Sequence, residues 1–373
     1  MRIRILYTLP NFNTAGSGKA LLNLALGLNK EQFEAHIACE SDKGSFFETV
    51  KKSGIPVHVF NYIPKRKPVL NWIKQSLEVR RKLKEINPDI VHSFHYSDNY
   101  TEGAAARLAG VKWVFTKKNM SWGGGSGNGW KFRSALANGI AVQNTDMITN
   151  FYPESKKVGL IPRGVDVKKF EFDGKDDAVK IAMKSENQRV IICVANMVPV
   201  KGVELLLKAF DTLHSSNANW SLWLIGDINN KYGQSLTEQA SQLKSADFIH
   251  FSGKQPDVKR YLNHAEIFVL PTKDEGRREG SPVALLEAMA NGKVVVGSAV
   301  PGVKDQLSQF PEHQFEPGNW QSLTQKLSKF TLNSTAENHR IGKKFNKHVS
   351  ENYSIELEIK RHEDFYKKVL NDE

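Results

Sequence analysis

Short runs of apolar, β-branched residues alternate with segments of helical periodicity along the first half of the chain. The runs predict strands at residues 2–8, 34–39, 56–60, 90–93, 113–116 and 139–143. Between them, apolar positions recur at helical spacing in residues 18–28, 46–53, 70–86 and 99–109. Regular alternation of strand and helix is typical of a parallel sheet covered by helices on both faces.

The same alternation restarts in the second half of the chain. It predicts strands at 190–196, 220–226, 248–252, 267–271 and 293–298, separated by helices at 202–214, 231–243, 256–264, 282–290 and 303–307. The predicted fold class is therefore α/β, with one Rossmann-like domain over residues 1–166 and a second over 167–353. We expect a last helix, at about 354–373, to pack back on the first domain.

Composition is that of a globular protein without a membrane-spanning segment. No run of about 18 apolar residues occurs, and Pro10 interrupts the N-terminal apolar stretch too early for a signal peptide. Cys39 and Cys193 lie far apart and outside any metal-binding spacing, which indicates core residues in a reducing cytoplasm. The glycine-rich run 123–129 predicts a mobile loop, either a plain connector or a lid.

The net charge of +12 is placed unevenly. The first 165 residues carry 24 Lys and Arg against 12 Asp and Glu, whereas the remaining residues carry 28 of each. Basic residues gather at 65–67 and in the helical segment 70–86, beside Trp72 and Ile73. Two interpretations fit: docking on anionic lipid at the inner face of a membrane, or the solvated face of an ordinary helix. Nucleic acid is not expected, because no recognition motif accompanies the charge.

The segment 267–292 contains the strongest candidate site. A buried strand is followed by a polar loop, then by Ser281 as a helix N-cap and Pro282 as the first helical residue. Such a helix start, at the carboxyl end of a parallel strand, favours phosphate binding. Glu279 before the cap and Glu287 within the helix could accept hydrogen bonds from sugar hydroxyls. Alternatively, these acids only stabilise the helix.

Several motifs in this order resemble the retaining glycosyltransferases of family 4. The stretch EGSPVALLEAMANG, from Glu279, is similar to the family's E-x7-E signature. IPRGVD at 161–166 resembles the interdomain segment, VANMVPVKG at 194–202 resembles the strand end that carries a K-G pair, and PDIVH at 88–92 resembles a strand of the first domain. The resemblance implies a GT-B fold, in which two Rossmann-like domains face each other across a cleft.

The resemblance also implies roles for residues of the second domain. Glu279 would lie by the donor sugar, and Glu287 would bind the nucleotide ribose. Lys201 would contact the donor diphosphate, which a compact ammonium can neutralise as the leaving group gains charge. Gly280, Ser281 and Pro282 would complete the phosphate site. Asn196 stands where the family has an arginine. Arg163, or Arg277 and Arg278 in the site loop, could substitute for it; alternatively, Arg163 is a solvated surface residue.

In the first domain, Gly16, Ser17 and Gly18 look like the family's glycine-rich loop, whose backbone N–H groups reach the donor phosphates. A Walker A motif is excluded, because Asn13 occupies the position of the motif's first glycine and Ala20 follows Lys19. Lys118 stands near the position where family members place a histidine, as a weak substitute for acid/base assistance. His92 is either a substrate contact or a structural histidine.

The function expected from the resemblance is retaining, metal-independent sugar transfer without a cofactor, the nucleotide-sugar being a substrate. The acceptor would be a saccharide or a lipid-linked saccharide in cell-surface polysaccharide or glycolipid synthesis. Two alternatives stay open: a nucleotide-sugar epimerase on the same architecture, and a binding protein with an impaired donor site. A nicotinamide dehydrogenase is less favoured than either, because no G-x-G-x-x-G follows a strand.

Overall fold

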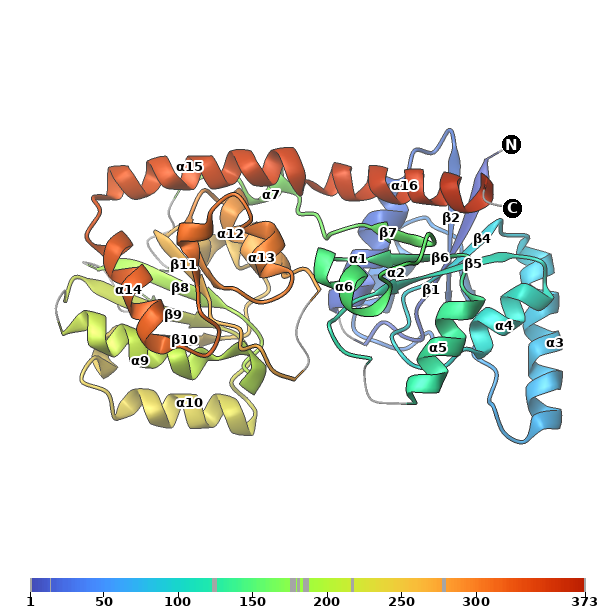
Figure 1. The fold of residues 1–373 in the computed structure, drawn as a ribbon, viewed down its shortest axis with the longest axis horizontal. Coiled ribbons are helices and arrows are strands. Elements are labelled where there is room, and N and C mark those ends of the chain that lie inside the picture. Colours follow the sequence, from blue (N-terminus) through green and yellow to red (C-terminus); the bar gives the residue numbers. More distant parts are fainter. Residues whose placement is uncertain are drawn as a thin grey trace. The chain divides into compact units, whose positions relative to one another are not determined.

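The structure, a computed structural model, describes residues 2–13, 15–122, 126–174, 179, 182–183, 188–215, 218–276 and 280–371. The chain divides into two compact units, one formed by Met1–Pro162 with Glu356–Glu373 and the other by Arg163–Ile355. Each unit is built on a parallel sheet with helices packed on it (Figure 1). The predicted α/β fold class, with two Rossmann-like domains, is confirmed.

The first unit contains a seven-stranded sheet in the order β3-β2-β1-β4-β5-β6-β7. The strands are β1 Ile3–Thr8, β2 Phe33–Cys39, β3 Val57–Val59, β4 Ile90–Ser93, β5 Lys112–Lys117, β6 Gly139–Val142 and β7 Val158–Leu160. Its helices are α1 Ala15–Gly27, α2 Phe47–Lys51, α3 Val69–Ile86, α4 Thr101–Leu108, α5 Gly127–Leu136, α6 Thr145–Phe151 and α16 Ile355–Asn371. Strand order reverses beside β1, which is where open α/β sheets bind ligands.

The second unit contains a six-stranded sheet in the order β10-β9-β8-β11-β12-β13. The strands are β8 Arg189–Val194, β9 Trp220–Ile225, β10 Ile249–Gly253, β11 Ile267–Leu270, β12 Val294–Ser298 and β13 Gln314–Phe315. The α-helices are α7 Val167–Phe170, α9 Val203–His214, α10 Lys231–Ser241, α11 Lys259–Leu262, α12 Val283–Ala290, α13 Val303–Gln306, α14 Trp320–Thr331 and α15 Thr335–Asn352. Short 3-10 segments are η1 Pro199–Lys201, η2 Ala246–Phe248 and η3 Pro311–His313.

Helix α16 belongs to the first unit, whose glycines make room for it. Phe365 and Tyr366 are buried in the core of that unit. A Cβ atom on Gly139 would lie 2.6 Å from the Phe365 ring, and one on Gly27 would lie 2.2 Å from Ile359. The aromatic and aliphatic side chains of α16 therefore occupy space that only glycine leaves open.

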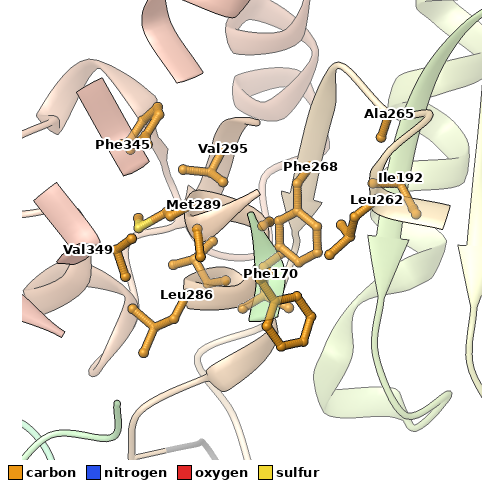
Figure 2. Close-up of a cluster of buried hydrophobic side chains, with 14 of the residues drawn as sticks. Phe170, Ile192, Leu262, Ala265, Phe268, Leu286, Met289, Val295, Phe345 and Val349 are labelled. Atoms are coloured by element: carbon orange, nitrogen blue, oxygen red, sulfur yellow. The ribbon is translucent and has the colours of Figure 1, made fainter. Parts of the chain in front are cut away.

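Helix α12 is fixed by a hydrophobic cluster of the second unit. Leu286 and Met289 of α12 are fully buried, together with Phe268 of β11 and Val295 of β12. Phe345 of α15 closes the cluster (Figure 2). A helix packed this closely cannot shift without opening a cavity, so its first turn is held at the edge of the sheet.

The prediction of a loop over 123–129 is wrong for its C-terminal residues, 127–129, which are helical. Residues 123–125 lie outside the described part of the chain, but α5 begins at Gly127. The Ser126 side chain caps the helix by accepting from the Gly129 N–H, and the Ser126 N–H donates to Asp98 at 3.0 Å. A Cβ on Gly129 would lie 2.7 Å from the Asp98 carbonyl oxygen, so close approach explains this glycine.

Candidate functional site

In the second unit, the segments that follow β8 and β11 lie against each other. The two strands are neighbours in the sheet, so their carboxyl ends share one edge. The Lys273 N–H donates to the Val200 carbonyl at 2.8 Å. Gly202 has φ +62°, and a Cβ there would lie 2.2 Å from the Pro271 carbonyl oxygen. This packing holds Lys201, a buried residue, at the ligand-binding edge of the sheet.

The first turn of α12 lies at the same edge. Pro282 is the N-cap and makes no side-chain cap hydrogen bond, so the prediction of Ser281 as the N-cap is wrong. The Ser281 hydroxyl instead accepts from the Arg163 N–H at 3.2 Å and from the Gln306 side chain at 3.0 Å. The N-cap itself therefore leaves the backbone N–H groups of the first turn without a side-chain acceptor, which is the arrangement that a phosphate site uses.

Gly280 packs against Gly302, in the turn before α13. Gly302 has φ +81°, and a Cβ there would lie 2.4 Å from the Gly280 carbonyl oxygen. The backbone of the 280–282 segment is thus enclosed between Arg163, Gln306 and Gly302. Such enclosure fixes the direction of backbone groups before any ligand binds.

The other predicted donor-binding residues differ in their burial. Glu287 lies in the second turn of α12 and is half-buried, whereas Asn196 is exposed just beyond β8. The Arg163 side chain is half-buried, and its backbone joins the site through Ser281. Glu279 lies outside the described residues, so its predicted role stays a prediction.

Sequence reasoning missed Lys273 as a second cation at this edge. Its ammonium lies 3.0 Å from the Glu204 carboxylate of α9 and 2.7 Å from that of Glu275. The pair with Glu204 ties the segment after β11 to the helix that follows Lys201. One feature of the sequence could have indicated Lys273: it lies two residues after Pro271, just beyond the end of a buried strand.

We expect Gly202→Ala to destabilise the protein more than an alanine at another glycine of positive φ would, because the added Cβ also collides with Pro271. Overpacking against Pro271 should lower the free energy of unfolding by about 1–3 kcal/mol and weaken donor binding. Gly253→Ala is the matched control, because Gly253 has φ +69° with no atom within 4 Å of the added Cβ. Denaturant unfolding and ligand titration of both variants check this, and equal losses in both would contradict it.

In the first unit, the glycine-rich segment forms the first turn of α1 and not a loop. The helix begins at Ala15, three residues earlier than predicted, and therefore includes Gly16, Ser17 and Gly18. The Lys118 ammonium, after β5, donates to the Ser17 hydroxyl at 3.2 Å and to the Phe94 carbonyl. The structure thus brings Lys118 and the glycine-rich segment together at the carboxyl edge of the sheet.

His92 is in the interior of the first unit. It has no exposed surface, and its two ring nitrogens lie 2.6 Å from the Tyr366 hydroxyl and 2.8 Å from the Thr116 hydroxyl. Burial lowers the pKa of His92 well below its usual range, so the ring is neutral at physiological pH. His92 therefore has the burial and the hydrogen-bond partners of a structural histidine.

Lys117 is a buried lysine whose burial sequence reasoning did not anticipate. Its ammonium donates to the carbonyls of Asn119 at 3.0 Å and Ser121 at 2.8 Å. It also lies 3.9 Å from the centre of the Phe151 ring and 4.6 Å from that of Trp122. These contacts stabilise the segment after β5, in which members of the family often have a histidine according to the resemblance.

Burial lowers the pKa of Lys117 to about 7, which makes stability depend on pH. Between pH ~7 and ~10 the unfolded chain binds a proton at this lysine that the native chain does not, so stability falls as pH falls. Lys117→Met should remove this slope, which is about 1.4 kcal/mol per pH unit between the two pKa values. Denaturant unfolding at both pH values checks it, with the exposed Lys131→Met as control. Parallel pH profiles in all three proteins would contradict it.

A second buried network joins the strand ends of the first unit. The Glu102 carboxylate accepts from the Thr8 hydroxyl at 2.5 Å and from the Ser93 hydroxyl at 2.6 Å. Arg133 donates to Ser93 and to the His95 carbonyl, both at 3.0 Å. This network orders the segment after β4 at the edge where Lys118 lies. Burial raises the pKa of Glu102, and the positive charge of Arg133 offsets only part of this rise.

Two protein families match consecutive halves of the chain. The family described as Glycosyltransferase Family 4 matches residues 14–169, and the one described as Glycosyl transferases group 1 matches residues 175–348. The chain belongs to glycosyltransferase family 4. This membership confirms the resemblance and does not favour the epimerase alternative.

Relatives of this family 4 chain include a lipopolysaccharide 1,2-N-acetylglucosaminetransferase of Salmonella typhimurium, 26% identical over 228 residues. That match spans 57% of this chain and 58% of the Salmonella protein, a little over half of each. An uncharacterized glycosyltransferase of Haemophilus influenzae is 24% identical over 352 residues, 87% of this chain and 89% of that protein. Among solved structures, Anabaena HepE in complex with UDP and glucose has a TM-score of 0.80 at 17% identity, covering 97% of this chain and 99% of its own.

Proposed function

We propose that this chain is a retaining glycosyltransferase that moves a sugar from a nucleoside diphosphate to a saccharide or lipid-linked acceptor. The observation that carries the proposal is that Lys201 and the first turn of α12 follow two neighbouring parallel strands, β8 and β11, and so belong to the same edge of the sheet. A cation and the N–H groups of a helix start together suit a diphosphate. The Anabaena structure, which contains UDP and glucose, supports a nucleotide-sugar as the donor.

The donor diphosphate would lie on the first turn of α12, with Lys201 neutralising the charge that grows on it. Glu287 would accept hydrogen bonds from the ribose hydroxyls, and Glu279 would lie by the sugar. The bond from the anomeric carbon to the phosphate oxygen breaks, and its electron pair stays on the diphosphate. The acceptor oxygen bonds the anomeric carbon on the same face, and its proton passes to the leaving phosphate. No metal is required, because Lys201 and the helix supply the positive charge.

The first unit would bind the acceptor, and its Gly16–Gly18 turn would help to hold the donor phosphates. The Salmonella relative acts on lipopolysaccharide, which supports an acceptor in cell-surface polysaccharide or glycolipid synthesis. Cys39 and Cys193 are both free thiols and both buried, in keeping with a place in the cytoplasm.

A transfer assay with the full chain tests this function. The protein is incubated with a panel of nucleotide-sugars and detergent-solubilised lipid-linked saccharides, and the products are identified by mass spectrometry and NMR. We expect one donor to give a product whose anomeric configuration is retained and whose formation resists chelators. An epimerised donor formed without acceptor would replace this proposal with the epimerase, and an inverted product would overturn the retaining mechanism.

A further inference from the structure

Helix α3 has two apolar stripes, of which only one is packed. Val79, Leu83 and Ile86 are buried in the core of the first unit. On another side of the helix, Val69, Leu70, Ile73 and Leu77 are exposed to 61, 82, 48 and 54%. A surface helix of a globular protein ordinarily carries one apolar stripe and a polar opposite face. The exposed stripe therefore needs an explanation other than folding.

Basic residues flank the exposed stripe. At 100° per residue, Lys74, Arg81 and Lys84 fall beside or within the arc that contains the exposed apolar residues, and all three are exposed. The exposed run 65–67, Lys-Arg-Lys, precedes Pro68, the N-cap of the helix. Glu85 lies 2.8 Å from Lys82 and 3.7 Å from Arg81 and offsets part of their charge. Residues 65–86 nevertheless carry eight Lys and Arg against two Glu, so a positive excess remains. The result is an apolar stripe with a basic border.

We propose that α3 docks the first unit on the surface of an anionic phospholipid bilayer. Val69, Leu70, Ile73 and Leu77 enter the boundary between headgroups and acyl chains, while the flanking lysines and arginines contact lipid phosphates. Within the described residues, no helix is long and apolar enough to cross a membrane, so the contact is one of surface binding. The docked surface brings the proposed acceptor-binding unit to lipid-linked saccharides, and this consequence alone rests on the proposed function.

Charge distinguishes a bilayer from a second copy of the chain. A two-fold dimer through α3 would bring the same basic border of both copies together, and like charges repel across an interface. The net charge of +12, which falls in the first 165 residues, favours an anionic partner in the same way.

Vesicle flotation of the full chain tests the proposal. We expect binding to vesicles that contain phosphatidylglycerol, weaker binding to phosphatidylcholine alone, and a decrease with added salt. The double variant Leu70→Ser/Leu77→Ser should lose at least about tenfold in partitioning. Leu332→Ser is the matched control, because Leu332 is an 81% exposed leucine of the second unit. The exposed positions of all three leucines leave the folded state intact, which circular dichroism verifies.

Three results would overturn the docking surface. They are no binding to anionic vesicles, equal binding by the α3 double variant, and a dimer in sedimentation that the double variant disrupts. Transfer to a detergent-solubilised acceptor is measured in parallel and should be unchanged in the double variant. An inactive wild type that still floats with vesicles would reject the proposed transfer reaction and leave the docking surface standing.

Discussion

Lys201→Met is expected to lower kcat for sugar transfer by about 100- to 1000-fold. Methionine keeps the apolar stem of this buried residue but removes its charge, so the fold at the end of β8 is preserved. The ammonium contributes most when the diphosphate leaves, because the charge on the phosphate oxygens is then greatest. kcat and kcat/KM should therefore fall together, with a smaller change in the affinity for the intact donor.

The control for this variant is Lys208→Met, which removes the same charge from an exposed position of α9. It should retain the wild-type rate, because a solvated lysine is screened from the site. A Lys201→Met enzyme with wild-type kcat would contradict the role of Lys201. A rise in KM at constant kcat would assign the residue to donor binding alone.

Glu287→Ala is expected to weaken donor binding by about 10- to 100-fold, which is the effect of removing a charged hydrogen-bond acceptor. If the carboxylate accepts from the ribose hydroxyls, a 2′-deoxyribose donor should already lack part of this interaction. The variant should therefore discriminate less than the wild type between ribose and 2′-deoxyribose nucleotides. Isothermal titration with both nucleotides measures the difference.

Glu238→Ala, at an exposed position of α10, is the matched control for Glu287→Ala. This control also removes an acidic side chain from the second unit, but from a helix other than α12. Equal affinities for the ribose and deoxyribose nucleotides in wild type and Glu287→Ala alike would assign Glu287 to helix stability instead. Loss of discrimination confined to Glu287→Ala is the result expected of a ribose contact.

Most central strands could be predicted from the sequence, because both faces of a parallel sheet are covered and the strands are apolar throughout. Strands β7 and β13 were not predicted, since three and two residues are too short for a pattern. Helix α15 was also missed. Several of its buried positions are polar or glycine, including Asn338, Gly342 and His348, so its apolar periodicity is faint.

The site could be predicted where it depends on topology and not where it depends on distant partners. Lys201 and the start of α12 follow adjacent parallel strands, and strand order alone places them at one edge. No local pattern indicates that Ser281 receives hydrogen bonds from Arg163 and Gln306, which lie 118 and 25 residues away. The burial of Lys117 and His92 was equally hidden, because strands covered on both faces give no alternation to separate inner from outer positions.

Binding of nucleotide-sugars to the full chain, measured by thermal shift across a panel, tests the donor site most directly. A ligand that binds only the folded state raises the midpoint of unfolding by mass action. We predict that at least one nucleoside diphosphate or its sugar conjugate raises the midpoint of the wild type, and that Lys201→Met and Glu287→Ala reduce the shift. A panel without any shift, or an equal shift in all three proteins, would contradict a donor site at the start of α12.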